Sequence, residues 1–304
     1  MRRTSVLLAL FAAALAAQAG AAPRQTGMTP EEFNAKLQYQ QGKVELRSGL
    51  ATLNLGPERR YLDPEQTERV LVAWGNPPGS KTLGMILPAD AGPLSKEGWG
   101  VIVTYEEDGY VDDKGAEKID YSKLLEEMKE GTTKANEERT KQGYEPIELV
   151  GWAEPPHYDR ANHKLYWAKD LKFGNLTDHT LNYNIRVLGR RGVLVLNAVS
   201  SMDQIGAIRQ SMQALLPEVE FNQGHRYADF IPGKDKVAEY GIGALVVGTL
   251  AAKAGLFKVI LAGLLAFKKA LLVGIAAIGA YLRKLFGKKD DSDTVPQAPA
   301  EPGA

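Results

Sequence analysis

The stretch TLNYNIRVLGRRGVLVLNAV, residues 180–199, contains two strand patterns joined by a short turn. Residues 180–188 and 192–199 are rich in β-branched and aromatic side chains, and the sequence Gly189-Arg-Arg-Gly192 between them is typical of a hairpin turn. Residues 193–196 are apolar at every position, so both faces of this strand should be buried. The stretch therefore predicts a hairpin whose second strand is central in a sheet.

Similar patterns on either side extend this hairpin into a larger fold. A strand–turn–strand pattern spans residues 42–55, and further strands are expected at 83–87, 101–105, 147–153 and 165–171. Helices are expected at 64–74, 121–142 and 205–215, from N-capping residues and apolar positions at helical spacing. The predicted class is α+β, a mostly antiparallel sheet with packed helices, followed by one or more C-terminal membrane helices. The ending of three strands and a helix resembles PsbP-type α/β/α sandwiches.

The first apolar end of the chain has the features of a cleaved signal peptide, residues 1–21. Arg2 and Arg3 precede an apolar run that is too short to cross a bilayer, and small residues follow it. We expect cleavage after Ala19 or Ala21. The exported body, residues 22–235, contains no cysteine, so its stability must come from its core rather than from disulfides.

The second apolar end, residues 236–289, is expected to anchor the protein in a membrane. Its length allows one tilted span or a two-segment hairpin. A third arrangement is an amphipathic helix lying in the membrane interface, because the lysines share one side of a continuous helix. The basic cluster Arg283, Lys284, Lys288 and Lys289 favours a cytoplasmic end. The prediction is a bacterial cell-membrane protein with its body on the periplasmic side, and a disordered cytoplasmic tail at 290–304.

The densest group of chemically versatile residues is GWAEPPHYD, residues 151–159. A strand is expected to end at Ala153, which would place Glu154, His157 and Asp159 on a loop stiffened by two prolines. Such residues could ligate a metal ion or supply an oriented base. The alternative is that the aromatic residues pack against the sheet edge while the polar groups cap turns.

A second cluster, residues 106–113, includes the weak metal-ligand candidates Asp108, Asp112 and Asp113. Its spacing lacks the alternation of an EF-hand loop, so a solvated loop at a strand end is the competing explanation. The chain contains no signature of a hydrolase elbow, a zinc protease or a phosphate-binding loop. No cofactor is expected, and a net charge of zero gives no indication of a nucleic-acid partner.

Three segments together resemble a bacterial family of predicted membrane-anchored proteins that is described only as a domain of unknown function. They are GWAEPPHYD at 151–159, YWAKDL at 166–171 and NYNIRVLG at 182–189, and an apolar C-terminus follows them. The resemblance implies an envelope location and membrane anchoring, and it implies no reaction.

Three functions remain open from the sequence. The first is a non-catalytic domain that binds an envelope protein or a second copy of itself beside the lipid bilayer, and small residues in the tract favour close helix packing. The second is an envelope hydrolase or metal-dependent enzyme that uses Glu154, His157 and Asp159. The third is membrane remodelling by the lysine-striped tract.

Overall fold

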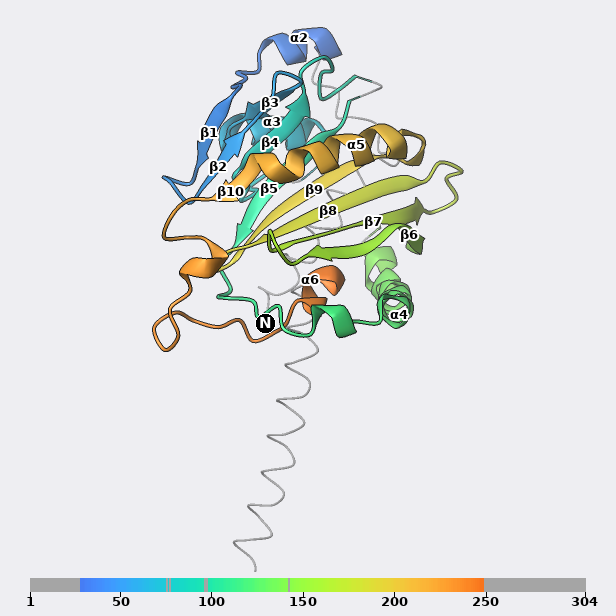
Figure 1. The fold of residues 1–304 in the computed structure, drawn as a ribbon. Coiled ribbons are helices and arrows are strands. Elements are labelled where there is room, and N and C mark those ends of the chain that lie inside the picture. Colours follow the sequence, from blue (N-terminus) through green and yellow to red (C-terminus); the bar gives the residue numbers. More distant parts are fainter. Residues whose placement is uncertain (1–27, 75, 77, 96–97, 142, 249–304) are drawn as a thin grey trace, which may run out of the picture. The chain divides into compact units, whose positions relative to one another are not determined.

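The structure is a computed structural model that describes residues 28–248 except 75, 77, 96, 97 and 142 (Figure 1). The predicted signal peptide, the tract beyond residue 248 with its basic cluster Arg283, Lys284, Lys288 and Lys289, and the tail at 290–304 lie outside the described residues. Within the described part, no helix is both long enough and apolar enough to cross a bilayer.

Strands in the described residues form two sheets, both antiparallel. The smaller has the order β1-β2-β10, with β1 at Lys43–Leu46, β2 at Ala51–Asn54 and β10 at Val219–Phe221. The larger has the order β3-β4-β5-β9-β8-β7-β6. Its strands are β3 (Arg59–Leu62), β4 (Gly84–Pro88), β5 (Gly100–Glu106), β6 (Ile147–Asp159), β7 (Lys164–Phe173), β8 (Thr180–Leu188) and β9 (Val193–Ser201).

The predicted hairpin is confirmed, and β9 is the fourth of the seven strands. The amide of Gly189 donates a 2.9 Å hydrogen bond to the carbonyl of Gly192 and closes the turn. Eight of the nine residues of β9 are buried, as expected for a central strand. The hairpin at 42–55 is also confirmed, and Arg47, Ser48 and Gly49 adopt positive φ angles at its turn.

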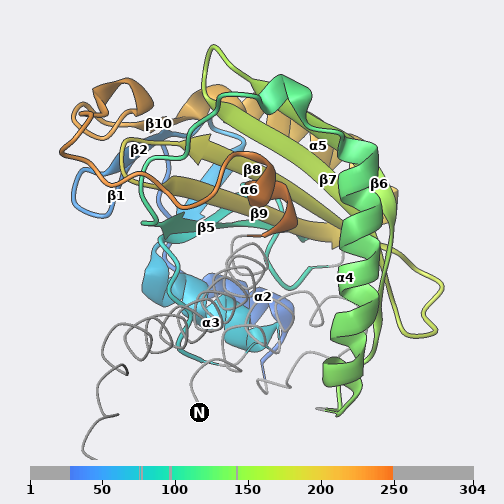
Figure 2. The same ribbon diagram turned by 90° about the horizontal axis from the view of Figure 1, so that it is seen from below.

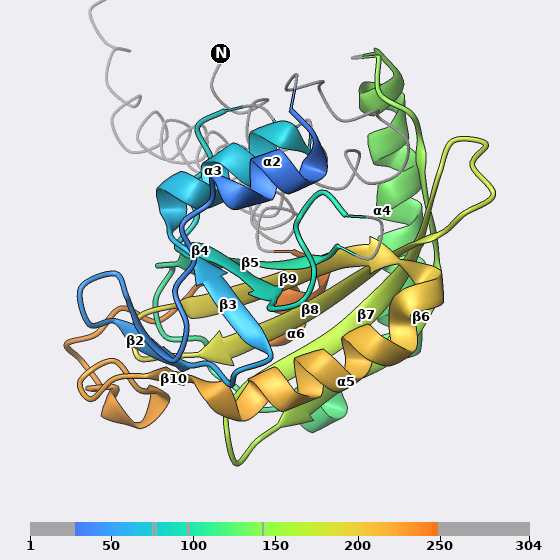
Figure 3. The same cartoon turned by 90° about the horizontal axis from the view of Figure 1, so that it is seen from above.

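Helices cover both faces of the large sheet. α5 (Ile205–Leu215) and the small sheet pack on one face, which Figure 3 shows from above. On the other face, α2 (Pro30–Ala35), α3 (Pro64–Ala73), α4 (Tyr121–Lys141) and α6 (Gly243–Val247) are visible from below in Figure 2. α3 and α4 begin where predicted, because Asp63 and Asp120 accept hydrogen bonds from backbone amides of the first turn.

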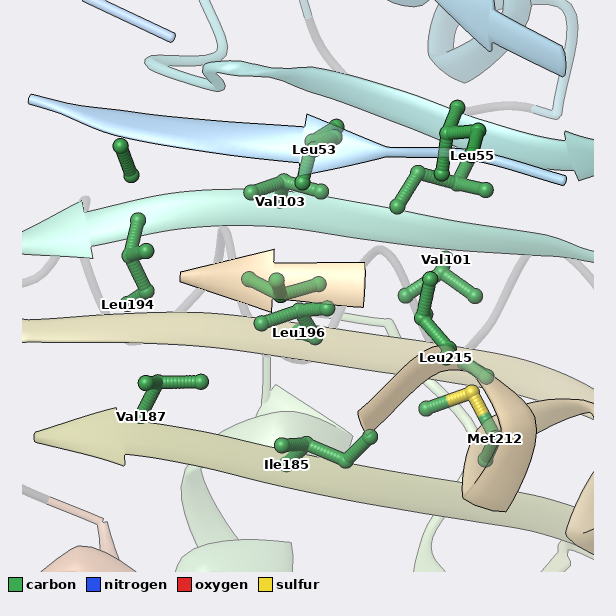
Figure 4. Close-up of a cluster of buried hydrophobic side chains, with 14 of the residues drawn as sticks. Leu53, Leu55, Val101, Val103, Ile185, Val187, Leu194, Leu196, Met212 and Leu215 are labelled. Atoms are coloured by element: carbon green, nitrogen blue, oxygen red, sulfur yellow. The ribbon is translucent and has the colours of Figure 1, made fainter. Parts of the chain in front are cut away.

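The core between the two sheets explains why α5 is amphipathic. Met212 and Leu215 of α5 meet Ile185 of β8 and Leu196 of β9, and Leu53 reaches the same cluster from the small sheet (Figure 4). All five side chains are almost completely buried. The α+β class with an antiparallel sheet and packed helices is therefore confirmed for the described part of the chain.

The first residues of the predicted membrane tract belong to the folded body. Ile242, Leu245 and Val246 are at most 3% exposed and pack in the same apolar cluster as Trp167 and Val195. Their apolar character therefore has a packing explanation inside the α+β domain.

Candidate functional site

The segment expected to form a proline-stiffened loop is instead part of a strand, and this expectation was wrong. β6 runs from Ile147 to Asp159 and contains both prolines. β6 is the last strand of the sheet order, where the missing amide hydrogen of proline can face away from the ladder. Irregular pairing with β7, including a register shift between Glu154 and His157, accommodates them.

Glu154 is occupied by two neighbours on the α5 face of the sheet. Its carboxylate accepts a 3.2 Å hydrogen bond from the hydroxyl of Tyr183 and a 2.9 Å contact from Nε of Arg209. Burial, with the Glu154 charge beside it, strongly raises the pKa of Tyr183. These contacts tie α5 to β6 and β8, which is a structural role.

His157 and Asp159 have separate partners. The exposed ring of His157 lies 5.1 Å, centroid to centroid, from that of its cross-strand neighbour Tyr166. Asp159 accepts hydrogen bonds from the amides of Ala161 and Asn162 and from the Asn162 side chain, which holds the pKa of its carboxyl below the usual value. The carboxylate therefore closes the β6–β7 turn. A shallow depression of about 210 Å³ reaches His157, and neither Glu154 nor Asp159 is among the residues lining it.

The three acidic metal candidates are likewise bound to different partners. Asp108 accepts a 2.8 Å hydrogen bond from the hydroxyl of Tyr240, whereas Asp112 accepts one from the backbone amide of Lys114. Asp113 accepts a 2.6 Å hydrogen bond from Tyr158. In the part of the chain that the structure describes, no group of three or more histidine, aspartate or glutamate side chains is arranged to hold a metal ion.

Asp113 is the polar end of an aromatic column that the sequence did not reveal. The rings of Phe230, Tyr110, Tyr227 and His163 stack in that order, with neighbouring centroids 4.0, 4.4 and 4.1 Å apart. Burial alone would raise the pKa of Asp113, but hydrogen bonds from tyrosine hydroxyls, together with electrostatic attraction to Arg160 and His163, outweigh it and lower that pKa. The column fastens the loop after β5 to the segment after β10.

The larger of the two depressions contains a histidine–aspartate pair. Nδ1 of His179 lies 2.8 Å from Oδ1 of Asp170, and the pocket of about 370 Å³ is also lined by Thr177, Asp178, Ser201, Met202 and Asp203. The Asp170 contact fixes the ring and leaves Nε2 as the nitrogen available to a ligand. Sequence spacing missed this pair, although the predicted strands 165–171 and 180–188 are separated by only a short connection, which brings the end of one near the start of the other.

The model of a protein family described as "Protein of unknown function (DUF2167)" matches residues 38–279. Because the match covers most of the chain, the chain belongs to this family. No curated protein matches the chain in sequence.

Three solved structures match part of the chain at low similarity. Cyanobacterial PsbP (CyanoP) from Synechocystis sp. PCC 6803 has a TM-score of 0.34 at 9% identity, covering 61% of this chain and 93% of that one. The Ran-binding protein Mog1p of Saccharomyces cerevisiae has a TM-score of 0.34 at 12% identity, with 64% and 100% covered. LpqN, involved in cell envelope biogenesis of Mycobacterium tuberculosis, has a TM-score of 0.28 at 14% identity, with 64% and 98% covered. Similarity this low supports no inference about function.

Proposed function

We propose that the chain, a member of this family of unknown function, is a bacterial envelope protein whose exported body binds a partner without catalysis. Its C-terminal tract holds the body at the cell membrane, with the body on the periplasmic side and the tail in the cytoplasm. The partner is an envelope protein or a second copy of the chain, and no cofactor takes part.

The observation that carries this proposal is the order of features along the chain. A signal-peptide pattern precedes a body with a closed core, and the last core helix, α6, lies at the start of the apolar tract, whose sequence continues well beyond it. The two groups singled out from sequence also support a non-catalytic role. The carboxylates of Glu154 and Asp159 accept hydrogen bonds that hold the fold together. Those of Asp108, Asp112 and Asp113 do the same.

Topology can be tested with single cysteines, because the natural chain has none. Tyr144→Cys, at a position 40% exposed in the body, should react with a membrane-impermeant maleimide in spheroplasts. Ser292→Cys in the tail should react only after the membrane is permeabilised. The protein should also stay with the membranes during a carbonate wash. Loss of the protein into the supernatant, or labelling of the tail in intact spheroplasts, would refute the anchored topology.

Partner binding needs its own experiment. Crosslinking in native membranes should give a discrete larger species that contains the chain. Co-expression of two differently tagged copies separates a homo-oligomer from a complex with another envelope protein. A chain that remains monomeric at every crosslinker concentration would contradict the proposed binding role.

A catalytic function is favoured by one specific observation, the Asp170–His179 pair in its polar pocket. An imidazole held by a carboxylate through Nδ1 is arranged as a general base at Nε2. If this candidate is correct, the full chain hydrolyses an activated ester such as p-nitrophenyl acetate, and His179→Gln abolishes that activity. His225→Gln is the control, since it is a histidine outside the pocket. Equal background rates for all three proteins would exclude this candidate for ester substrates.

A further inference from the structure

Two cations on neighbouring strands lie on the α4 and α6 side of the large sheet. Lys169 of β7 and Arg186 of β8 project to the same side as Trp167, because side chains alternate along each strand and these strands pair in register. Arg186 is 5% exposed and Trp167 is fully buried, while Lys169 is partly buried.

The buried guanidinium of Arg186 has few hydrogen-bond partners and no ion-pair partner among the described residues. Its guanidinium lies 5.0 Å from the centroid of the Trp167 ring, and Nη1 donates a 3.2 Å hydrogen bond to the carbonyl of Ile185, its own chain neighbour. Among the described residues, no carboxylate lies within ion-pair distance of this side chain. Glu106 acts on it electrostatically from further away, and burial lowers its pKa to about 10.

The other donors of this group are also unmatched. Lys169 makes no ion pair or hydrogen bond within the described part of the chain, and burial together with the Arg186 charge lowers its pKa to about 8. The indole Nε1 of Trp167 is buried and has no hydrogen-bond acceptor. Thus two positive charges and one unsatisfied N–H donor lie on one face of β7 and β8.

Neighbouring asparagines strengthen the polar character of this region. Asn184 donates a 2.9 Å hydrogen bond to the side-chain oxygen of Asn182, which in turn donates one of 2.7 Å to Asn197. All three are buried, although their positions on β8 and β9 could hold apolar side chains. The amides satisfy one another and supply no charge, so the carboxylate that acts on Arg186 in the described part of the chain is that of Glu106, beyond ion-pair distance.

Leaving buried charges and donors unpaired is costly, so such groups normally have a counter-ion or a ligand. We propose that Lys169, Arg186 and the indole N–H of Trp167 form a binding site for a phosphate group. A guanidinium matches two phosphate oxygens, an ammonium supplies a second positive charge, and the indole donates to a third oxygen. Partly buried Lys169 is the point of entry. This site does not depend on the proposed membrane anchoring or on a protein partner.

The first test measures thermal unfolding of the full chain in a non-ionic detergent, with phosphate exchanged for chloride at constant ionic strength. Phosphate should raise the unfolding midpoint by about 2–4 °C once it exceeds its Kd several-fold. Trp167→Phe keeps the ring and removes the donor, and Lys169→Gln removes a charge. Each should weaken phosphate binding by about tenfold or more.

Lys172→Gln is the matched control, because Lys172 lies on the same strand, is also partly buried and points to the opposite face. It should bind phosphate as the wild-type chain does. The source of the phosphate is then tested with short-chain phosphatidylglycerol and phosphatidylcholine, both below their micelle concentrations. A response only to the anionic lipid assigns the site to a lipid headgroup, and a response to inorganic phosphate assigns it to a free anion.

Two results would overturn the proposal. One is the absence of any stabilisation by inorganic phosphate and by either lipid. The other is a loss of binding in Lys172→Gln as large as in Lys169→Gln and Trp167→Phe, because the effect would then be general charge screening.

Discussion

The carboxylate of Asp235 meets the guanidinium of Arg190 through two hydrogen bonds, 2.7 Å from Nε to Oδ2 and 3.1 Å from Nη2 to Oδ1. Arg190 belongs to the turn between β8 and β9, whereas Asp235 lies in the irregular segment that leads to α6. Asp235 also accepts a hydrogen bond from the amide of Ile231. One carboxylate therefore attaches the segment before α6 to the central hairpin.

Asp235→Asn should make the stability of the protein less sensitive to pH in the acid range. The Arg190 hydrogen bond is the main cause that lowers the pKa of Asp235 to about 2, from 3.8. Its contribution to stability is therefore complete above pH 4 and is lost as the pH falls toward 2. Urea unfolding should show a stability difference between wild type and variant at pH 5 that narrows toward pH 2.5. Asp90→Asn, at an exposed position, should match the wild type, and a constant difference would contradict the linkage.

Gly109→Ala should weaken the contact between the loop after β5 and the segment before α6. Gly109 has a φ of +114°, and a Cβ there would lie 2.7 Å from the carbonyl oxygen of Lys236. We expect a loss of about 1–3 kcal/mol in unfolding free energy. Gly131→Ala in α4 meets no atom within 4 Å and should instead gain about 0.5–1 kcal/mol. Chemical denaturation of the two variants measures both signs, and a stable Gly109→Ala protein would show that the contact is dispensable.

Leu245→Ala tests whether α6 belongs to the body. Leu245 is 1% exposed, so truncation should cost about 2–5 kcal/mol in unfolding free energy. Val237→Ala, at a position 51% exposed, should change stability by less than about 0.5 kcal/mol. A membrane-embedded Leu245 would leave the stability of the body unchanged in both variants.

Lys169→Met should stabilise the protein at neutral pH in buffers without phosphate. The pKa of Lys169 falls to about 8 from 10.5, so the folded chain binds this proton less tightly than the unfolded chain does. The resulting cost is present below pH 8 and disappears as the pH rises past 10.5. We expect a gain on the order of 1–2 kcal/mol at pH 7, and a smaller one at pH 10. The charged group that acts on Lys169 is Arg186, and Glu106 and Tyr240 in turn act on Arg186.

Urea unfolding at pH 7 and pH 10 measures this gain, with Lys172→Met as the control. A variant that is equally stable or less stable than wild type at pH 7 would mean that Lys169 already has a counter-charge.

The half of the sheet from β6 to β9 could be predicted because short turns join these strands in chain order. β8 was recognised from its β-branched and aromatic residues, and the central place of β9 was predicted from the continuous apolar residues 193–196. The predicted strand 147–153 ended too early, before the prolines of β6, because the sequence alone did not reveal that β6 is an edge strand. β3 was missed because Arg59 and Arg60 hide its pattern, and the buried Arg59 is neutralised by Glu218 at 2.9 Å, far along the chain.

Candidate sites were predicted less well, because their residues come from different strands. Asp170 and His179 are joined only through the β7–β8 hairpin, so no spacing rule identifies them. Lys169 and Arg186 look like solvent-facing residues of alternating strands. Only the helices on the second face of the sheet show that these charges are covered.

If the chain is exported as we propose, the position of β9 has a consequence for secretion. Its neighbour β5 ends at Glu106, and residues 107–192 are made before β9 can pair with it. During translocation of an exported chain, β5 would therefore emerge with an unprotected hydrogen-bonding edge. Such delayed long-range pairing slows folding, so a periplasmic holding chaperone would have its main task in the interval before residues 193–201 leave the translocon.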